Sequence, residues 1–147
     1  MDGFVPVGEM NAMRTTLPAL VIGLLLLGGA TARAHHAFAA EFDLNRPVQL
    51  TGTVTSVEWI NPHAWIHVAV KKPDGTVETW AIETGTPNTL LRRGLKKADL
   101  PTGIQIKVSG YQAKDGSPRA NGSNVSLPDG RSLFLGGSGA GAPPPSN

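Results

Sequence analysis

The chain has no cysteine, only four histidines and few aromatic residues. Without cysteine it has neither a disulfide nor a thiolate metal site, so its stability depends on packing and any metal ligand must be His, Asp or Glu. The small number of aromatic residues beside 18 glycines and 12 prolines favours strands and turns over a helical bundle. A length of 147 residues, of which 40% are apolar, fits one small domain.

A strong charge of either sign is also missing. The formal net charge is only +2, well short of the concentrated positive field with which proteins displace counterions from nucleic acids. The one basic cluster, "RRGLKK" at residues 92–97, is typical of a solvated surface at the end of a helix. We therefore expect no nucleic-acid partner.

Long apolar runs are absent except for "LPALVIGLLLL", residues 17–27. This run is too short to span a bilayer comfortably, and it is followed by Ala32 and Ala34 at the two positions before the cut that signal peptidase requires to be small. The sequence therefore predicts a signal peptide over residues 1–34, a periplasmic or secreted protein, and no membrane span after cleavage. Because acidic residues near the first methionine are unusual in a signal peptide, Met13 is the alternative start that the sequence offers.

Apolar and polar residues alternate in several short stretches after the predicted signal peptide, which is typical of β-strands. A long first strand is predicted from Val48, with a bulge where Val57 breaks the alternation. The next two strands are predicted in "HAWIHVAV" and "VETWAIE", which a turn at Pro73-Asp74-Gly75 separates.

The pattern then changes to that of a short helix. Thr86 is the predicted N-cap, Pro87 the first helical residue and Gly94 the stop. Alternation returns in "IQIKVSGY", then in a fifth strand through residues 124–127, and in a short sixth piece, "SLFL". The apolar side chains expected to face the core are Ala64, Ile66, Val68, Val70, Trp80, Ile82, Ile104, Ile106 and Val108.

Three strands, a helix and two further strands follow one another in the order of an OB-type barrel. The sequence thus predicts an all-β domain over residues 48–135, a small five- to six-stranded OB-like barrel with one short helix between strands three and four. Residues 35–47 are predicted to pack on the barrel, and the Gly- and Pro-rich residues 136–147 to be disordered. A three-stranded meander with an irregular extension is the alternative.

Four stretches carry a resemblance to a known group of proteins: "HHAFAAEFD", "LTGTVTSVEWINPHAWIHV", "TPNTLLRRG" and "YQAKDGSPRANGSNVSLPDGR". Together they resemble a functionally uncharacterised family of small exported bacterial proteins with an HHAF start and an NPHAW motif. The similarity covers nearly all of residues 35–134. It implies export and a single compact domain, and it implies no activity.

The position of the first histidines points to a metal. Cleavage after Ala34 would make His35 the N-terminal residue, whose α-amine and ring nitrogen can chelate one ion together with a second imidazole. Such a set of three nitrogens suits copper, and it resembles the histidine brace of copper monooxygenases and of some periplasmic copper carriers. His63 is the preferred second ligand because it lies in a loop, and His36 is a further candidate. His67 would lie about 13 Å from His63 on a continuous strand, too far to share one ion.

Other side chains are candidates for supporting roles. Glu41 and Asp43 are possible oxygen ligands, and Tyr111 is a distant candidate for an axial position. Trp65 and His67 are expected on the outer face of the second strand, where OB-type barrels commonly hold ligands by stacking. In the alternative, Phe38 and Phe42 of the N-terminal segment cover Trp65.

We therefore expect a non-enzymatic, exported binding module that holds a small ligand or an envelope protein on the face of its second and third strands. Copper at His35 and His63 is the expected cofactor if a metal is bound. Two alternatives use other chemistry: a copper-dependent oxidase with the same ligands, and a structural envelope protein without a metal site.

Overall fold

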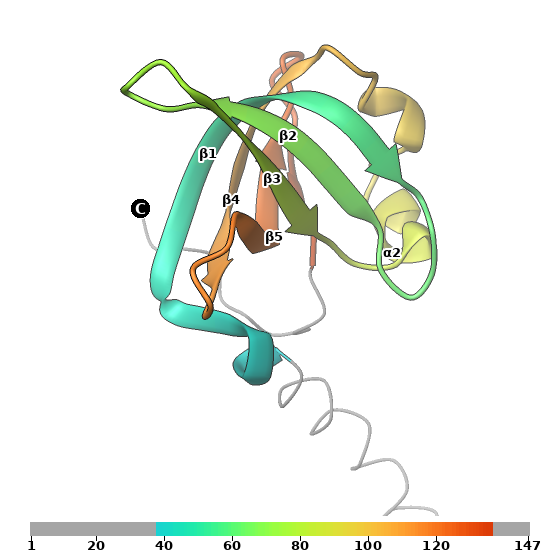
Figure 1. Ribbon diagram of the computed structural model, residues 1–147. Coiled ribbons are helices and arrows are strands. Elements are labelled where there is room, and N and C mark those ends of the chain that lie inside the picture. The colour runs from blue at the N-terminus through green and yellow to red at the C-terminus, as the bar shows by residue number, and fades with distance from the viewer. Residues whose placement is uncertain (1–37, 137–147) are drawn as a thin grey trace, which may run out of the picture. The chain divides into compact units, whose positions relative to one another are not determined.

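The computed structural model describes residues 38–136 (Figure 1). All of them belong to one unit of the chain, Ala34–Asn147. The predicted signal peptide, the pair His35 and His36, and nearly all of the predicted tail lie outside the described residues. Between residues 38 and 136, no helix is both long enough and apolar enough to cross a membrane.

The described chain is mostly antiparallel β-sheet with few short helices, which confirms the predicted all-β class. After a helical turn at residues 38–41, the elements follow one another in the predicted order: three strands, then a short helix, then further strands. The elements are β1 Phe42–Glu58, β2 Trp65–Lys71, β3 Val77–Glu83, α2 Pro87–Arg92, a 3-10 helix Lys97–Asp99, β4 Gln105–Ala113, β5 Arg119–Ser126 and β6 Ser132–Phe134.

The six strands form one sheet in the order β3-β2-β1-β4-β5-β6, with every neighbouring pair antiparallel. A further, parallel pairing joins β3 to β5, where Ala81, Ile82 and Glu83 lie opposite Arg119, Ala120 and Asn121. Each strand from β1 to β5 therefore has a neighbour on both sides, and the sheet curls strongly in Figure 1.

Two strands begin earlier than predicted. β1 begins at Phe42 rather than Val48, because Phe42 pairs with Ala113 of β4 ahead of a register shift that ends at Pro47. β5 begins at Arg119 rather than near Asn124. The predicted bulge in the first strand is present, since the register with β2 shifts between Val54 and Ser56.

Apolar side chains at every second position of the strands fill the core, as predicted. Ile66 and Val68 of β2 and Ile82 of β3 are at most 1% exposed, and Ile104 packs on the core at its edge. Leu90, Leu95 and Leu100, from α2 and the segment after it, join the same cluster. The hydrophobic effect thus binds the sheet and the helical segment into one unit.

The helix α2 begins and ends where the sequence predicts. The Thr86 hydroxyl oxygen accepts the backbone N–H of Thr89 at 3.2 Å, and Pro87 occupies the first turn. Gly94 adopts a φ of 87°, a left-handed conformation that glycine reaches without steric cost, and so ends the helix.

A second apolar cluster ties the N-terminal end of β1 to β4. It consists of Phe38, Phe42, Tyr111 and Ala113, all buried. The Phe38 ring lies 5.7 Å from the Phe42 ring and 6.0 Å from the Tyr111 ring, centroid to centroid, the latter pair edge to face. Burial of these rings explains why β1 extends upstream of its alternating part.

Replacing Phe42 by alanine should lower the free energy of unfolding by about 3–5 kcal/mol, because a large buried ring would leave a cavity. Leu44→Ala is the matched control, since Leu44 is 52% exposed, and it should change stability by no more than about 0.5 kcal/mol. Urea denaturation followed by circular dichroism measures both. Equal losses in the two variants would contradict the role of the second cluster.

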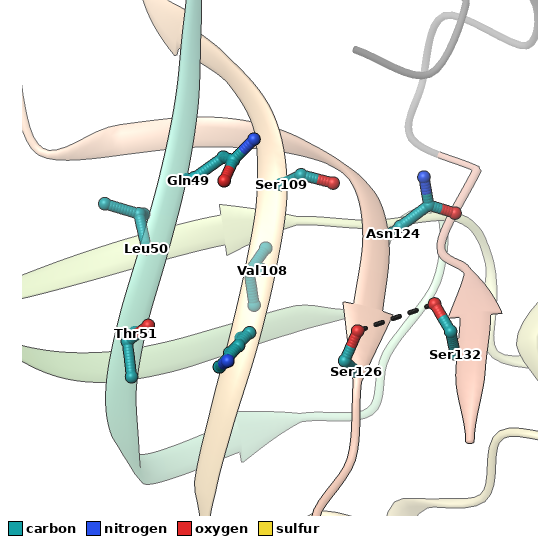
Figure 2. A pocket seen from close by; sticks show the side chains of 9 residues that line it. Gln49, Leu50, Thr51, Val108, Ser109, Asn124, Ser126 and Ser132 are labelled. Atoms are coloured by element: carbon teal, nitrogen blue, oxygen red, sulfur yellow. Dashed lines mark hydrogen bonds between the residues drawn. The ribbon is translucent and has the colours of Figure 1, made fainter. Parts of the chain in front are cut away.

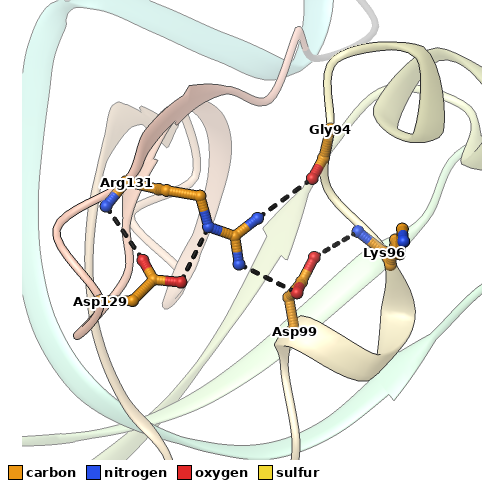
Figure 3. Close-up of polar contacts among 5 residues, drawn as sticks. All are labelled: Gly94, Lys96, Asp99, Asp129 and Arg131. Carbon is orange, nitrogen blue, oxygen red and sulfur yellow. Dashed lines mark hydrogen bonds and ion pairs between the residues drawn. The ribbon is translucent and has the colours of Figure 1, made fainter.

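Arg131 connects the turn between β5 and β6 to the segment after α2 (Figure 3). Its guanidinium donates to Asp129 Oδ2 at 2.8 Å, to Asp99 Oδ1 at 2.9 Å and to the carbonyl oxygen of Gly94 at 3.2 Å. Asp99 also accepts the Lys96 N–H at 2.7 Å. Charge-assisted hydrogen bonds from one planar fork thus hold three separate points of the chain together.

These contacts make stability depend on pH. The Arg131 guanidinium, followed by the Lys96 N–H, holds the pKa of Asp99 below its ordinary value. A carboxylate with a lowered pKa contributes stability above its unfolded pKa of about 4, and that contribution is lost as pH falls through the folded pKa. Asp99→Asn should therefore be less stable than the wild type at pH 7, and the difference should shrink on acidification.

Thermal unfolding midpoints at a series of pH values between about 7 and 2 measure this difference. Glu41→Gln, which removes one exposed carboxylate elsewhere, serves as the control for overall charge. A difference between Asp99→Asn and the wild type that stays constant across the series would show that the Asp99 charge is not responsible.

Candidate functional site

His63 lies in the loop just before β2, and its ring is held in one orientation by β3. The Nδ1 atom is 3.2 Å from the carbonyl oxygen of Thr84 and 3.7 Å from Oε1 of Glu83. Because a carbonyl oxygen can only accept, Nδ1 carries the proton in this contact, which in the neutral tautomer leaves the lone pair on Nε2. The side chain is 31% exposed, so the ring is partly open to solvent.

The backbone around His63 continues the β2–β3 ladder beyond the strand ends. Ala64 N–H donates to the carbonyl oxygen of Gly85 at 3.1 Å, and Thr84 N–H donates to the carbonyl oxygen of Ala64 at 2.9 Å. The Thr84 hydroxyl donates to the same Ala64 oxygen, also at 2.9 Å. The loop is therefore a fixed support for the imidazole.

Glu83 is a buried acid at the end of β3. Its alternation with the inward-facing Ile82 places it on the outer face of the sheet, yet its side chain is only 7% exposed. In register with it are Trp65 of β2 and Asn121 of β5, and Tyr111 of β4 lies opposite Asn121. We call Trp65, Glu83, Asn121 and Tyr111 the seam row.

The seam row places four different functional groups side by side on four strands. Adjacent members are about 4.8 Å apart, the spacing of paired strands. Glu83, Asn121 and Tyr111 are buried, whereas Trp65 is half-buried. An indole, a carboxylate, an amide and a phenol thus follow one another across the sheet, and the Glu83 carboxyl group lies beside the ring of His63.

Trp65 stands on the outer face of β2, as predicted, and is not covered by the residues proposed for that role. Phe38 and Phe42 pack on Tyr111 and Ala113 of β4 instead. The alternative in which these two rings cover Trp65 is therefore wrong. The reason is the parallel β3–β5 pairing, which places two strands between β2 and β4 along the seam row.

His67 also lies on the outer face of β2, but with a different carboxylate. Its Nε2 is 2.8 Å from Oε1 of Glu58 on β1. His63 and His67 thus each have their own acidic neighbour. Within residues 38–136, no group of three His, Cys, Asp or Glu side chains is placed to hold a metal ion.

The remaining candidate ligands are engaged elsewhere. Glu41 forms an exposed ion pair with Arg119 at 3.4 Å, and Asp43 pairs with Arg46 at 3.7 Å. Tyr111 packs in the second apolar cluster. The structure therefore brings none of the predicted supporting ligands to His63.

Glu83 is the residue that the sequence did not reveal. "VETWAIE" predicts a strand, but alternation assigns its last residue to an ordinary outer position. Its proximity to His63 depends on the register of β2 with β3, and its burial depends on the neighbouring β5. An acidic residue directly before a helix N-cap segment was the one visible hint.

Comparison with known proteins gives a family and no activity. Residues 24–123 match a protein family described as a family of unknown function (DUF6152). Neither the curated proteins nor the solved structures include a match to this chain. The match covers more than half of the sequence and includes β1 to β4, His63 and Glu83. The chain therefore belongs to this family of unknown function, in agreement with the resemblance found in its sequence.

Proposed function

We propose that the protein is an exported binding module with an OB-like barrel, in which His63 contributes a nitrogen ligand to a copper ion. The barrel is supported by the order of pairing, β1-β2-β3-β5-β4 and back to β1, with α2 between β3 and β4. An OB fold pairs its strands in the same order, and its ligands commonly lie on the face of strands two and three.

The observation that carries the copper proposal is the orientation of His63. Metal-binding histidines almost always donate their second ring N–H to a carbonyl or carboxylate, which fixes the tautomer and the direction of the free nitrogen. His63 has both kinds of acceptor at Nδ1, Thr84 at 3.2 Å and Glu83 at 3.7 Å. Its Nε2 is then the nitrogen available to a metal.

A second reason is reach. His35 precedes Phe38 by three residues, which span at most about 11 Å of extended chain. Phe38 packs against Tyr111, at one end of the seam row. From Tyr111 to Glu83 is about 10 Å across two strand spacings. Three extended residues thus cover about the distance between Tyr111 and Glu83, and in the proposed site they run along the seam row so that the α-amine and imidazole of a mature N-terminal His35 approach His63.

The charge of the seam row favours a cation. The buried Glu83 carboxyl group lies 3.7 Å from the inner nitrogen of His63, where a carboxylate would offset part of the charge of Cu(II). Imidazole and amine nitrogens suit copper more than magnesium or calcium, which take oxygen ligands. His36 is a further candidate ligand by its position in the chain.

Binding of Cu(II) to the protein beginning at His35 should weaken by about tenfold or more in His63→Ala, because one of three nitrogen ligands is lost. His67→Ala is the matched control: it removes the same residue type four positions further along, on β2, where the ring is paired with Glu58, and it should leave affinity unchanged. Isothermal titration calorimetry measures all three. Equal affinity of the wild type and His63→Ala would exclude His63 as a ligand.

Cleavage after Ala34 is required for this site. The protein recovered from the periplasm should have the mass of a chain that begins at His35, measured on the intact protein. A variant that retains Ala34 keeps both imidazoles and blocks chelation by the His35 amine, so it should bind Cu(II) more weakly. Undiminished binding by that variant would remove the amine from the proposal.

A further inference from the structure

A polar hollow lies on the outer face of β1, β4, β5 and β6, and it shares no residue with the His63 site (Figure 2). Its volume is about 410 Å³, within the usual range for small-ligand sites, roughly 300–1,000 Å³. Its walls carry hydroxyl, amide and ammonium groups together with Leu50 and Val108, and no aromatic ring or carboxylate lines it. The surface is thus unlike an apolar ligand pocket.

The polar side chains form two parallel rows fixed by the strand register. Gln49, Ser109 and Asn124 lie in register across β1, β4 and β5. Two residues along each strand, the second row comprises Thr51, Lys107, Ser126 and Ser132. Neighbours in a row are about 4.8 Å apart, and the rows are about 7 Å apart.

This grid is hollow because its side chains are short. Ser109 stands between Gln49 and Asn124 in the first row, and Ser126 and Ser132 stand side by side at the end of the second row (Figure 2). An ordinary solvated sheet face is polar as well. Here, however, three serines on adjacent strands leave a depression in which a ligand is in contact with several strands at once.

Most of these groups are not used by the fold. Within the described chain, the side chains of Gln49, Thr51, Ser109, Asn124 and Lys107 have no hydrogen-bond or ion-pair partner. The one internal contact of the grid is between the hydroxyls of Ser126 and Ser132, at 3.5 Å. By contrast, arginine and lysine residues at several other places on the surface are paired with acids. The hollow therefore retains its capacity to bind a polar ligand.

The functional groups that line the hollow favour some classes of ligand over others. A peptide cannot add as a strand within the hollow because β4 and β5 are paired on both sides there, and β1 is paired with β4 on the side that faces it. A nucleic acid would need more cations than Lys107 alone. A lipid chain would need apolar walls. A ligand rich in hydroxyls, which both donate and accept, matches the amides and serines, and one negative group matches Lys107.

We propose that this hollow is a binding site for an acidic oligosaccharide. The two rows hydrogen-bond the sugar hydroxyls, and the Lys107 ammonium holds a carboxylate of the chain. The proposal is independent of the copper site, since neither residue set nor ligand is shared.

The probe is a trimer of galacturonic acid, titrated into ¹⁵N-labelled full-length mature protein and followed by amide chemical shifts. Shifts should concentrate on the two rows, and Lys107→Gln should weaken binding by about tenfold. Lys71→Gln removes an exposed lysine at the end of β2 and should leave binding unchanged. Ser126→Leu, which fills the hollow without changing charge, should also abolish the shifts.

Two further probes decide what is recognised. Cellotriose, a neutral trisaccharide, should bind more weakly than the acidic trimer, and acetate alone should not shift the two rows. Equal shifts with acetate would reduce the hollow to a simple anion site and overturn the proposal. So would shifts located outside the rows, no shifts with the acidic trimer, or equal binding by Lys107→Gln.

Discussion

The parallel pairing of β3 with β5 is the contact on which the rest of the structure depends. It involves only Ala81–Glu83 and Arg119–Asn121, extended by the Ala81 N–H donating to the carbonyl oxygen of Pro118 at 3.0 Å. Without it, β3 would be the free edge of an otherwise antiparallel sheet, with unpaired backbone groups. It also sets Glu83 beside Asn121 and so creates the seam row.

Glycine makes this close approach possible. A Cβ at Gly122 would stand 2.7 Å from Leu135 Cδ1 and 2.8 Å from Ile82 Cγ2, both in the core. A Cβ at Gly110 would overlap the backbone oxygen of Asn121 across the β4–β5 pair. These contacts are with core side chains and with backbone, which cannot move aside as a flexible surface side chain can. A side chain at Gly110 or Gly122 would therefore force β5 away from its partners.

Local signals in the sequence were sufficient for most elements. Alternation identified β2, β3 and β4, and a cap, a proline and a glycine delimited α2, because these signals depend on a few adjacent residues. The start of β1 was missed because polar residues and Pro47 follow Phe42, whose burial depends on β4. Glu83 was missed for the same reason, since register between strands is not encoded in a short window.

β5 was the hardest element to predict, and its irregularity is also what gives the outer surface its two different regions. Ser109 pairs with Asn124 and the next residue, Gly110, pairs with Gly122, so Ser123 is the extra residue of a bulge. The bulge reverses the alternation along β5: Ala120 and Val125 both face the core although they differ in parity. Asn121 and Asn124 can then both lie on the outer face, one in the seam row and one in the polar hollow.

A regular strand would turn one of these two amides into the core, where an amide without partners is costly. The hydroxyl of Ser123 itself is buried without a hydrogen-bond partner among the described residues. The bulge therefore carries a cost of its own, which the placement of polar groups on both outer regions offsets.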